Sequence, residues 1–242
     1  MDAEVRPKVL LVYYTLTKQV GRVADAMAED LEARGCDVSS ALIEFTDQRW
    51  LPKLSEFPMK RPIPQIASIL IAQLRHKTGE IQIPAEAKAG DYDLVVIASP
   101  TWWFQTSMPI RSYLESPEAK AVLGGKPFAC VSVSRRYFSI NLGQQKKLGE
   151  KNGGRWLGKT HFVVAGGQVK SMLSWLGYMK HGEPQEHVMG LTMPPPNLQP
   201  DFEEEVSTFV DSLVDGLGGQ SSHSGNGTLT TLADAAGGSG SR

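Results

Sequence analysis

The chain is poor in the residues that mark disulfide-bonded and metal-binding proteins. Its 242 residues include two cysteines, Cys36 and Cys130, both in apolar surroundings and without a Cys-x-x-Cys pair. The five histidines do not recur at metal-ligand spacing, so we expect no metal site. These features argue against a disulfide framework and favour a reducing compartment, so we expect a cytoplasmic protein.

Long apolar runs and a large net charge are also missing. No uninterrupted apolar stretch reaches the roughly 18 residues that cross a bilayer, so we expect no transmembrane segment. The first residues, Met-Asp-Ala-Glu, lack the positive charge that opens a signal peptide. A formal net charge of -1 argues against nucleic acid as the main partner.

Three familiar motifs are absent as well. There is no Gly-x-Gly-x-x-Gly after the first apolar run, no Walker-type lysine motif and no Gly-x-Ser-x-Gly elbow. These absences count against dinucleotide-binding folds, nucleoside triphosphate-binding folds and the usual serine hydrolases.

What is present is a regular alternation of strand and helix patterns. Apolar runs predict strands, and apolar residues at helical spacing predict helices. Short strands that are apolar on both faces indicate a parallel sheet covered on both sides. We therefore expect an α/β fold, a flavodoxin-like doubly wound five-stranded parallel sheet in a three-layer sandwich. The predicted strands are 9–13, 37–45, 94–99, 126–134 and 159–165, and the predicted helices are 20–34, 66–74, 109–115, 141–152 and 201–217.

The same pass along the chain divides it into a domain and a tail. Residues 1–217 are predicted to form the domain, with insertions at about 46–90 and 166–200, and 77–89 is predicted as loop. Residues 218–242 are rich in Gly, Ser and Thr, so we expect them to be disordered.

The first predicted strand ends in a hydroxyl-rich turn that leads directly into a helix. A helix N-terminus carries unpaired N–H groups and partial positive charge, which together bind phosphate. Thr15 and Thr17 can add hydroxyl donors, and Lys18 or Arg22 can add charge. The alternative is that the threonines simply cap the helix.

Aromatic residues follow the next two strand ends. Trp102, Trp103 and Phe104 come after a buried strand and are suited to stack on a flat, conjugated ligand. Alternatively they pack as core beneath the insertion at 46–90. Tyr137 could cover a ring, and Arg135 or Arg136 could meet a phosphate; the alternative is a solvated basic pair beside a half-buried tyrosine. In a doubly wound sheet these loops meet beyond the strand ends.

Two of these loops resemble a known family. Residues 14–20 are similar to the phosphate loop usually written Thr/Ser-x-Thr-Gly-x-Thr, and 99–103 to the ring-contacting loop Ser/Gly-Pro-Thr-Tyr/Trp of the flavodoxin-like superfamily. That superfamily includes flavodoxins and flavin-dependent NAD(P)H:quinone reductases. The resemblance covers roughly residues 8–165 and the last helix. Lys18 stands where the family often has glycine, and Val20 where it often has threonine. Residues 134–196 also resemble a subgroup labelled dialkylrecorsinol condensing enzyme.

The resemblance implies an FMN-binding oxidoreductase that passes electrons from NAD(P)H to a quinone-like or other small acceptor. It implies a cofactor site formed by Thr15, Thr17, Lys18, Gln19, Val20, Pro100, Thr101, Trp102, Trp103, Phe104, Ser134, Arg135 and Tyr137. No catalytic side chain is identified. Alternatives are an electron-carrier flavodoxin and a flavin-free binding protein of the same fold. Segment 166–200 is interpreted as a local cap; the alternatives are a lid, a homo-oligomer contact or a membrane-surface contact through 170–180.

Overall fold

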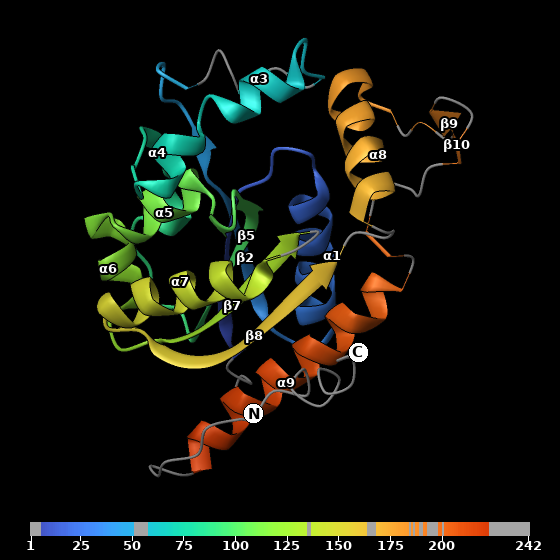
Figure 1. The fold of residues 1–242 in the computed structure, drawn as a ribbon. Helices are drawn as coiled ribbons and strands as arrows, with labels where there is room; N and C mark the ends of the chain where they lie inside the picture. The colour runs from blue at the N-terminus through green and yellow to red at the C-terminus, as the bar shows by residue number, and fades with distance from the viewer. Residues whose placement is uncertain are drawn as a thin grey trace, which may run out of the picture.

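The central sheet has the strand order of a doubly wound fold. The computed structural model describes residues 6–50, 58–134, 137–163, 168–183, 185, 187–188, 191–192, 198–199 and 201–222 (Figure 1). Five strands pair in parallel in the order β2 (Asp37–Leu42), β1 (Lys8–Tyr13), β5 (Leu94–Trp102), β7 (Pro127–Ser134), β8 (Arg155–Val163). Counting these five strands along the chain, the order is 2-1-3-4-5, which defines a flavodoxin-like sheet and confirms the predicted fold class.

Alternation along each strand builds two cores, one on each face of the sheet. Val9 and Leu11 pack with α1 (Gln19–Ala33) and α9 (Phe202–Ser222). Leu10 and Val12 belong to the opposite core, which includes residues of α5 (Met108–Leu114), α6 (Pro117–Leu123) and α7 (Phe138–Lys151). Figure 1 shows α1 and α9 side by side on their face, so the molecule has three layers.

The first insertion differs in detail from its prediction. The helix expected at 66–74 is two short helices, α3 (Pro62–Ala67) and α4 (Leu70–Leu74). The loop prediction for 77–89 was wrong in part, because β4 (Ile81–Gln82) pairs with β3 (Glu44–Phe45) and a 3₁₀ turn follows at Ala85–Ala87. A strand of two residues has no periodicity to read, so only its partner reveals it.

The second insertion contains α8 (Gln168–His181) and a small hairpin, β9 (His187–Val188) with β10 (Leu191–Thr192). Helix α8 lies beside α3 (Figure 1). Helix α9 continues past the predicted end at residue 217 to Ser222. Arg135, Arg136 and residues 223–242 lie outside the described residues. Within the described part of the chain, no helix is both long enough and apolar enough to span a membrane.

Candidate functional site

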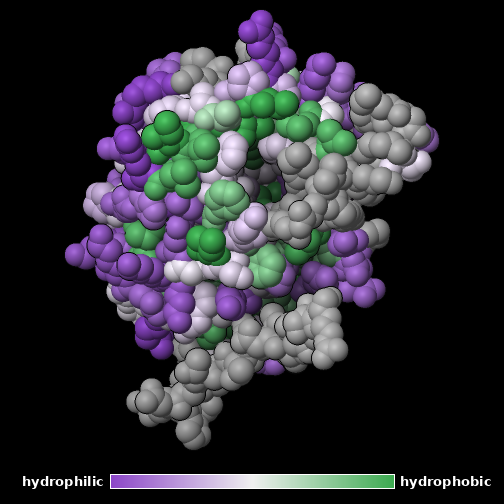
Figure 2. Space-filling model, viewed as in Figure 1, coloured by the Kyte–Doolittle hydropathy of each residue, from purple (hydrophilic) through white to green (hydrophobic). Residues whose placement is uncertain are grey.

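The loops after β1, β5 and β7 meet at one edge of the sheet. The rings of Tyr14 and Trp102 join the first two loops, with centroids 5.5 Å apart and planes at 85°. Phe104 and Tyr137 join the second and third, at 4.4 Å and 90°. The strand order reverses between β1 and β5, so this edge is the topological switch point where doubly wound sheets bind ligands. Figure 2 shows this face of the protein hollowed near its centre, beneath a band of apolar residues.

Backbone strain is concentrated on these same loops. Trp103 (φ 44°) and Phe104 (φ 71°) are the two central residues of the hairpin between β5 and β6 (Gln105–Thr106). Positive φ at both positions makes it a type I′ turn, which normally takes Asn-Gly. Lys18 (φ 63°) and Tyr137 (φ 61°) are the N-cap residues of α1 and α7.

These four residues account for most of the strain in the described chain. Among its non-glycine residues, positive φ recurs once more, at His76. Each left-handed residue costs about 1–2 kcal/mol. Strain of this kind persists where the surrounding structure holds it in place, and it gathers at ligand sites.

The turn into α1 offers hydrogen-bond donors rather than a cap. The N-cap residue is Lys18, whose side chain has no acceptor atom and makes no capping hydrogen bond. The Oγ1 atom of Thr15 is buried without a hydrogen-bond partner, so the threonine-capping alternative is not observed there. Val20 is buried in the core, and it faces the turn only with its backbone N–H, which has no partner within the helix.

The side chain of Gln19 is directed to the protein itself. Its Oε1 accepts from the backbone N–H of Leu198 at 3.3 Å and from Nη1 of Arg22 at 3.4 Å. The carbonyl of Thr17 accepts from the hydroxyl of Tyr178 at 3.4 Å. The second insertion is thereby attached to this turn, and Gln19 can serve a ligand through its backbone.

The aromatic residues after β5 divide into two pairs. Trp102 is 9% exposed and meets the ring edges of Tyr14 and Phe45. Trp103 donates from Nε1 to the carbonyl of Ile66 in α3, at 3.0 Å. These two tryptophans match the alternative that they pack beneath the 46–90 insertion.

Phe104 and Tyr137 form the other aromatic pair. They are 40% and 49% exposed and contact each other edge to face. Their rings are more exposed than those of Trp102 and Trp103, and they are accessible to a flat ligand.

A buried amide that the sequence did not single out fixes the ends of β5 and β7. Asn141 of α7 is fully buried, and its Nδ2 donates to Thr101 Oγ1 at 3.1 Å and to Ser132 Oγ at 3.0 Å. Gln145 donates to its Oδ1 at 2.9 Å. Asn141 and Gln145 are four residues apart on a helix that faces the core, and this spacing of two amides is the sequence signal that could have identified them. The network orders the strand ends that carry the second and third loops.

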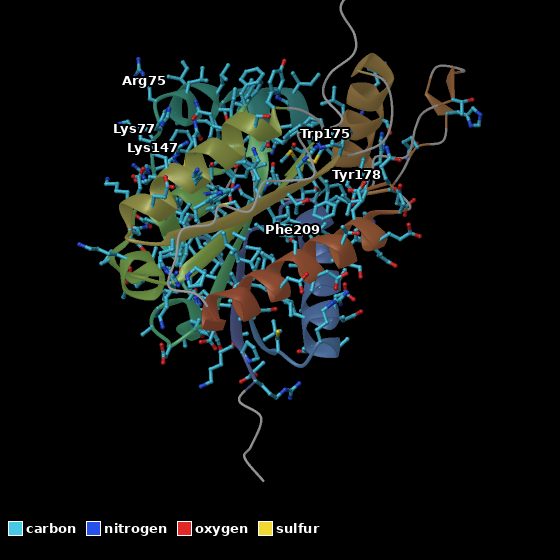
Figure 3. All side chains as sticks on the ribbon, turned by 90° about the horizontal axis from the view of Figure 1, so that it is seen from below. Arg75, Lys77, Lys147, Trp175, Tyr178 and Phe209 are labelled. Carbon is cyan, nitrogen blue, oxygen red and sulfur yellow. The ribbon has the colours of Figure 1, made fainter. Side chains whose placement is uncertain are left out.

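A buried guanidinium lies behind the strained hairpin and was also missed. Arg111 of α5 is 2% exposed and contacts Gln105 Oε1 at 3.1 Å, Gln144 Oε1 at 2.9 Å and His76 Nδ1 at 2.7 Å. All three acceptors are uncharged side-chain atoms. Burial lowers the pKa of Arg111, and burial together with this cation lowers the pKa of His76. In Figure 3, Arg75, Lys77 and Lys147 lie together on one side of the molecule.

Pro100 and Ser134, two further residues of the predicted site, lie at the same edge. Pro100 pairs with Val133 near the end of the parallel strands, and Ser134 is the last residue of β7. The Oγ of Ser134 is buried without a hydrogen-bond partner, like that of Thr15. The two unpaired buried hydroxyls and the helix N-terminus can donate hydrogen bonds to a phosphate. The exposed aromatic pair can contact a flat ring. This combination suits a phosphorylated aromatic molecule such as FMN.

The strand order and the loops at the switch point place this protein in the flavodoxin-like fold class. No protein-family model matches the sequence, and no curated protein sequence matches it significantly. Among solved structures, the chain is similar to a flavoprotein in complex with FMN from Lactobacillus acidophilus NCFM, with 16% identity, 64% of this chain and 93% of that one covered, and a TM-score of 0.49.

Two further solved structures have similar scores. Oxidised flavodoxin 2 from Bacillus cereus has 14% identity, covers 86% of this chain and 99% of its own, and gives a TM-score of 0.47. The flavodoxin, WrbA-like protein from Agrobacterium tumefaciens has 14% identity, coverage of 87% and 97%, and a TM-score of 0.45. The fold assignment rests on the strand order rather than on these scores.

Proposed function

We propose that this protein binds FMN where the three loops meet and is an oxidoreductase that uses it. The observation that carries the proposal is the strain on those loops: Lys18, Trp103, Phe104 and Tyr137 are all held at positive φ. A chain free of such a constraint would place glycine or asparagine at these positions. The unpaired hydroxyls at the same edge add independent support.

The phosphate is assigned to the N-terminus of α1. Thr15 Oγ1 and the first N–H groups of the helix donate to it, and the helix dipole favours its charge. The left-handed backbone of Lys18 opens the turn as glycine would, and its exposed side chain adds a positive charge. Ser134 supplies a further hydroxyl from the end of β7.

The ring is assigned to the Phe104–Tyr137 pair. The two rings stand at 90° to each other, so one can stack on a face of the flavin ring and exclude water from it, while the other contacts the edge of the flavin ring. Trp102 and Trp103 support the loop from beneath, since one is packed in the core and the other is hydrogen-bonded to α3. Arg111 places positive charge behind Gln105 at the base of the hairpin.

Bound FMN supplies hydride and single-electron transfer, so the protein's part is binding, orientation and exclusion of water. We propose NAD(P)H as donor and a quinone-like or other small molecule as acceptor. A net charge of -1 supports this over an electron carrier, because carriers that dock on proteins are usually strongly acidic. Two free cysteines, both buried, suit the reducing cytoplasm that we propose as the location.

The test is a titration of the full chain with FMN, in which binding is measured by the change in flavin fluorescence. Phe104→Asn accepts the left-handed backbone but removes the ring, whereas Phe104→Tyr keeps the ring. We expect Phe104→Asn to bind FMN about fivefold more weakly, because stacking contributes about 1 kcal/mol. Phe104→Tyr should stay close to the parent affinity.

Three outcomes decide between the candidate functions. Binding of FMN with steady-state NAD(P)H oxidation supports the oxidoreductase. Binding of FMN without oxidation of either NADH or NADPH supports an electron carrier instead. A chain that stays colourless and does not quench FMN fluorescence contradicts the cofactor assignment and supports a flavin-free binding protein.

A further inference from the structure

A groove lies apart from the strand ends, between the two insertions. It has a volume of about 650 Å³ and lies between one wall formed by residues 60–64, at the start of α3, and a second wall formed by α8 from Leu173 to His181. That volume is within the range of sites for small organic ligands. The backbone N–H of Met59 donates to the carbonyl of Met179 at 2.6 Å, which joins the two walls.

The groove has an apolar lining in which large side chains stay accessible. Ile63 is 65% exposed and Leu173 is 38% exposed, and they come from opposite walls. Pro62, Pro64 and Leu176 extend the same lining. These residues can bury an aliphatic or aromatic body without any change in the core.

The rest of the lining is basic. Lys60, Arg61 and Lys180 carry positive charge, and the imidazoles of His181 and His187 add N–H groups. Among the described residues that line the groove, none is acidic. An apolar lining combined with cations of one sign is complementary to a molecule with an apolar body and an anionic head.

We propose that this groove binds one molecule of a small amphiphilic carboxylate. Its apolar chain lies along Ile63 and Leu173, and its carboxylate head lies among the basic residues. The concave shape and the volume of about 650 Å³ favour one small molecule over a flat membrane surface. The absence of acids among the described lining residues favours an anion over a cation. The proposal goes beyond FMN binding and does not depend on it.

Both walls of the groove are attached to the loops of the strand edge. Ile66 of α3 accepts the hydrogen bond of Trp103, and Tyr178 of α8 donates to the carbonyl of Thr17. Figure 3 shows Trp175 and Tyr178 extending from α8, and Tyr178 is buried while Trp175 packs against the core. A ligand between these walls therefore contacts the elements that hold the strained hairpin and the turn into α1.

The test is titration calorimetry of the full chain without FMN, using monomeric decanoate as the probe. We expect saturable binding of one decanoate and no binding of decyltrimethylammonium, which has the same chain and the opposite charge. The charge-reversed variant Arg61→Glu/Lys180→Glu should bind decanoate about tenfold more weakly. The apolar variant Ile63→Ser/Leu173→Ser should lose a similar factor.

Lys120→Glu is a charge-reversal control outside the groove: Lys120 is exposed on α6, away from the groove lining, so the variant should leave decanoate binding unchanged. Each variant is first compared with the parent in its thermal unfolding midpoint, and the mutated groove residues are exposed or partly exposed, so the fold should be retained. Absence of saturable decanoate binding, or equal binding of both probes, would overturn the proposal. Co-sedimentation of the protein with anionic phosphatidylglycerol vesicles would also overturn it, because the groove would then be a membrane contact. A dimer that disappears in the apolar variant would overturn it as well, because the groove would then be an interface between two copies of the chain. Failure of FMN to bind leaves these readouts intact, so the two proposals are separable.

Discussion

Thr15 provides the sharpest test of the phosphate assignment, because the same substitution at a second threonine has the opposite expected effect. Thr15→Val replaces a buried hydroxyl that has no partner with a methyl group of similar size. Removing an unsatisfied buried hydroxyl relieves a desolvation cost of about 1–2 kcal/mol. The free energy of unfolding of the FMN-free protein should therefore rise by about 1 kcal/mol.

Thr101→Val is the matched control. The Oγ1 of Thr101 accepts from Asn141 Nδ2 at 3.1 Å and lies 3.3 Å from Ser132 Oγ. Its loss removes an acceptor from a buried network, so the free energy of unfolding should fall by about 1–2 kcal/mol. Urea denaturation of both variants at the same pH gives the comparison directly.

The binding measurement completes this test. If Thr15 Oγ1 donates to a phosphate, Thr15→Val should weaken FMN binding about tenfold or more, because a hydrogen bond to a charged group contributes about 1.5–3 kcal/mol. A more stable protein with weaker FMN binding is the expected combination. Destabilisation of both variants alike, or unchanged FMN affinity in Thr15→Val, would refute the reasoning that this hydroxyl is kept for a ligand.

Two further predictions concern packing and pH. Gly149→Ala should lower the free energy of unfolding by about 1–3 kcal/mol, since its Cβ would lie 2.4 Å from Phe128 Cε2. Gly143 lies on the same helix, but a Cβ there would meet open space, so Gly143→Ala should raise the free energy of unfolding by up to about 1 kcal/mol. Urea denaturation measures both changes. Hydrogen bonding from Arg49 lowers the pKa of Asp47 to about 2, so its stabilising contribution is present above the unfolded pKa near 3.9 and is lost as pH falls towards 2. The difference in urea midpoint between the parent and Asp47→Asn should narrow from pH 5 to pH 2, and a constant difference would contradict the ion pair.

The strands and main helices were predictable because each has enough residues to show a period. Alternate burial of Val9 and Leu10 on opposite faces, and the repeat of Val20, Val23 and Met27 in α1, are local consequences of strand and helix geometry. The sheet edge where we propose the site was predictable from the same order, since parallel strands all end at one edge.

Contacts between distant segments were beyond the reach of the sequence. The pairing of β3 with β4 joins Glu44 to Gln82 and Phe45 to Ile81, which are far apart in the sequence, and neither strand is long enough to show a period. Arg111 reads as a surface residue, yet it is buried by Gln105, Gln144 and His76 from three other segments. A buried charge is stable only when such acceptors surround it, and they are assembled by folding.

The sequence by itself determined the layers and the edge of the sheet where chemistry can occur, because hydrophobic period and chain order are local properties. Tertiary structure alone decided which side chains face that edge. It packed Trp102 into the core, left Phe104 and Tyr137 accessible, and left the hydroxyl of Thr15 without a partner. These outcomes depend on how segments from different parts of the chain compete for the same space, and only the folded arrangement settles that competition.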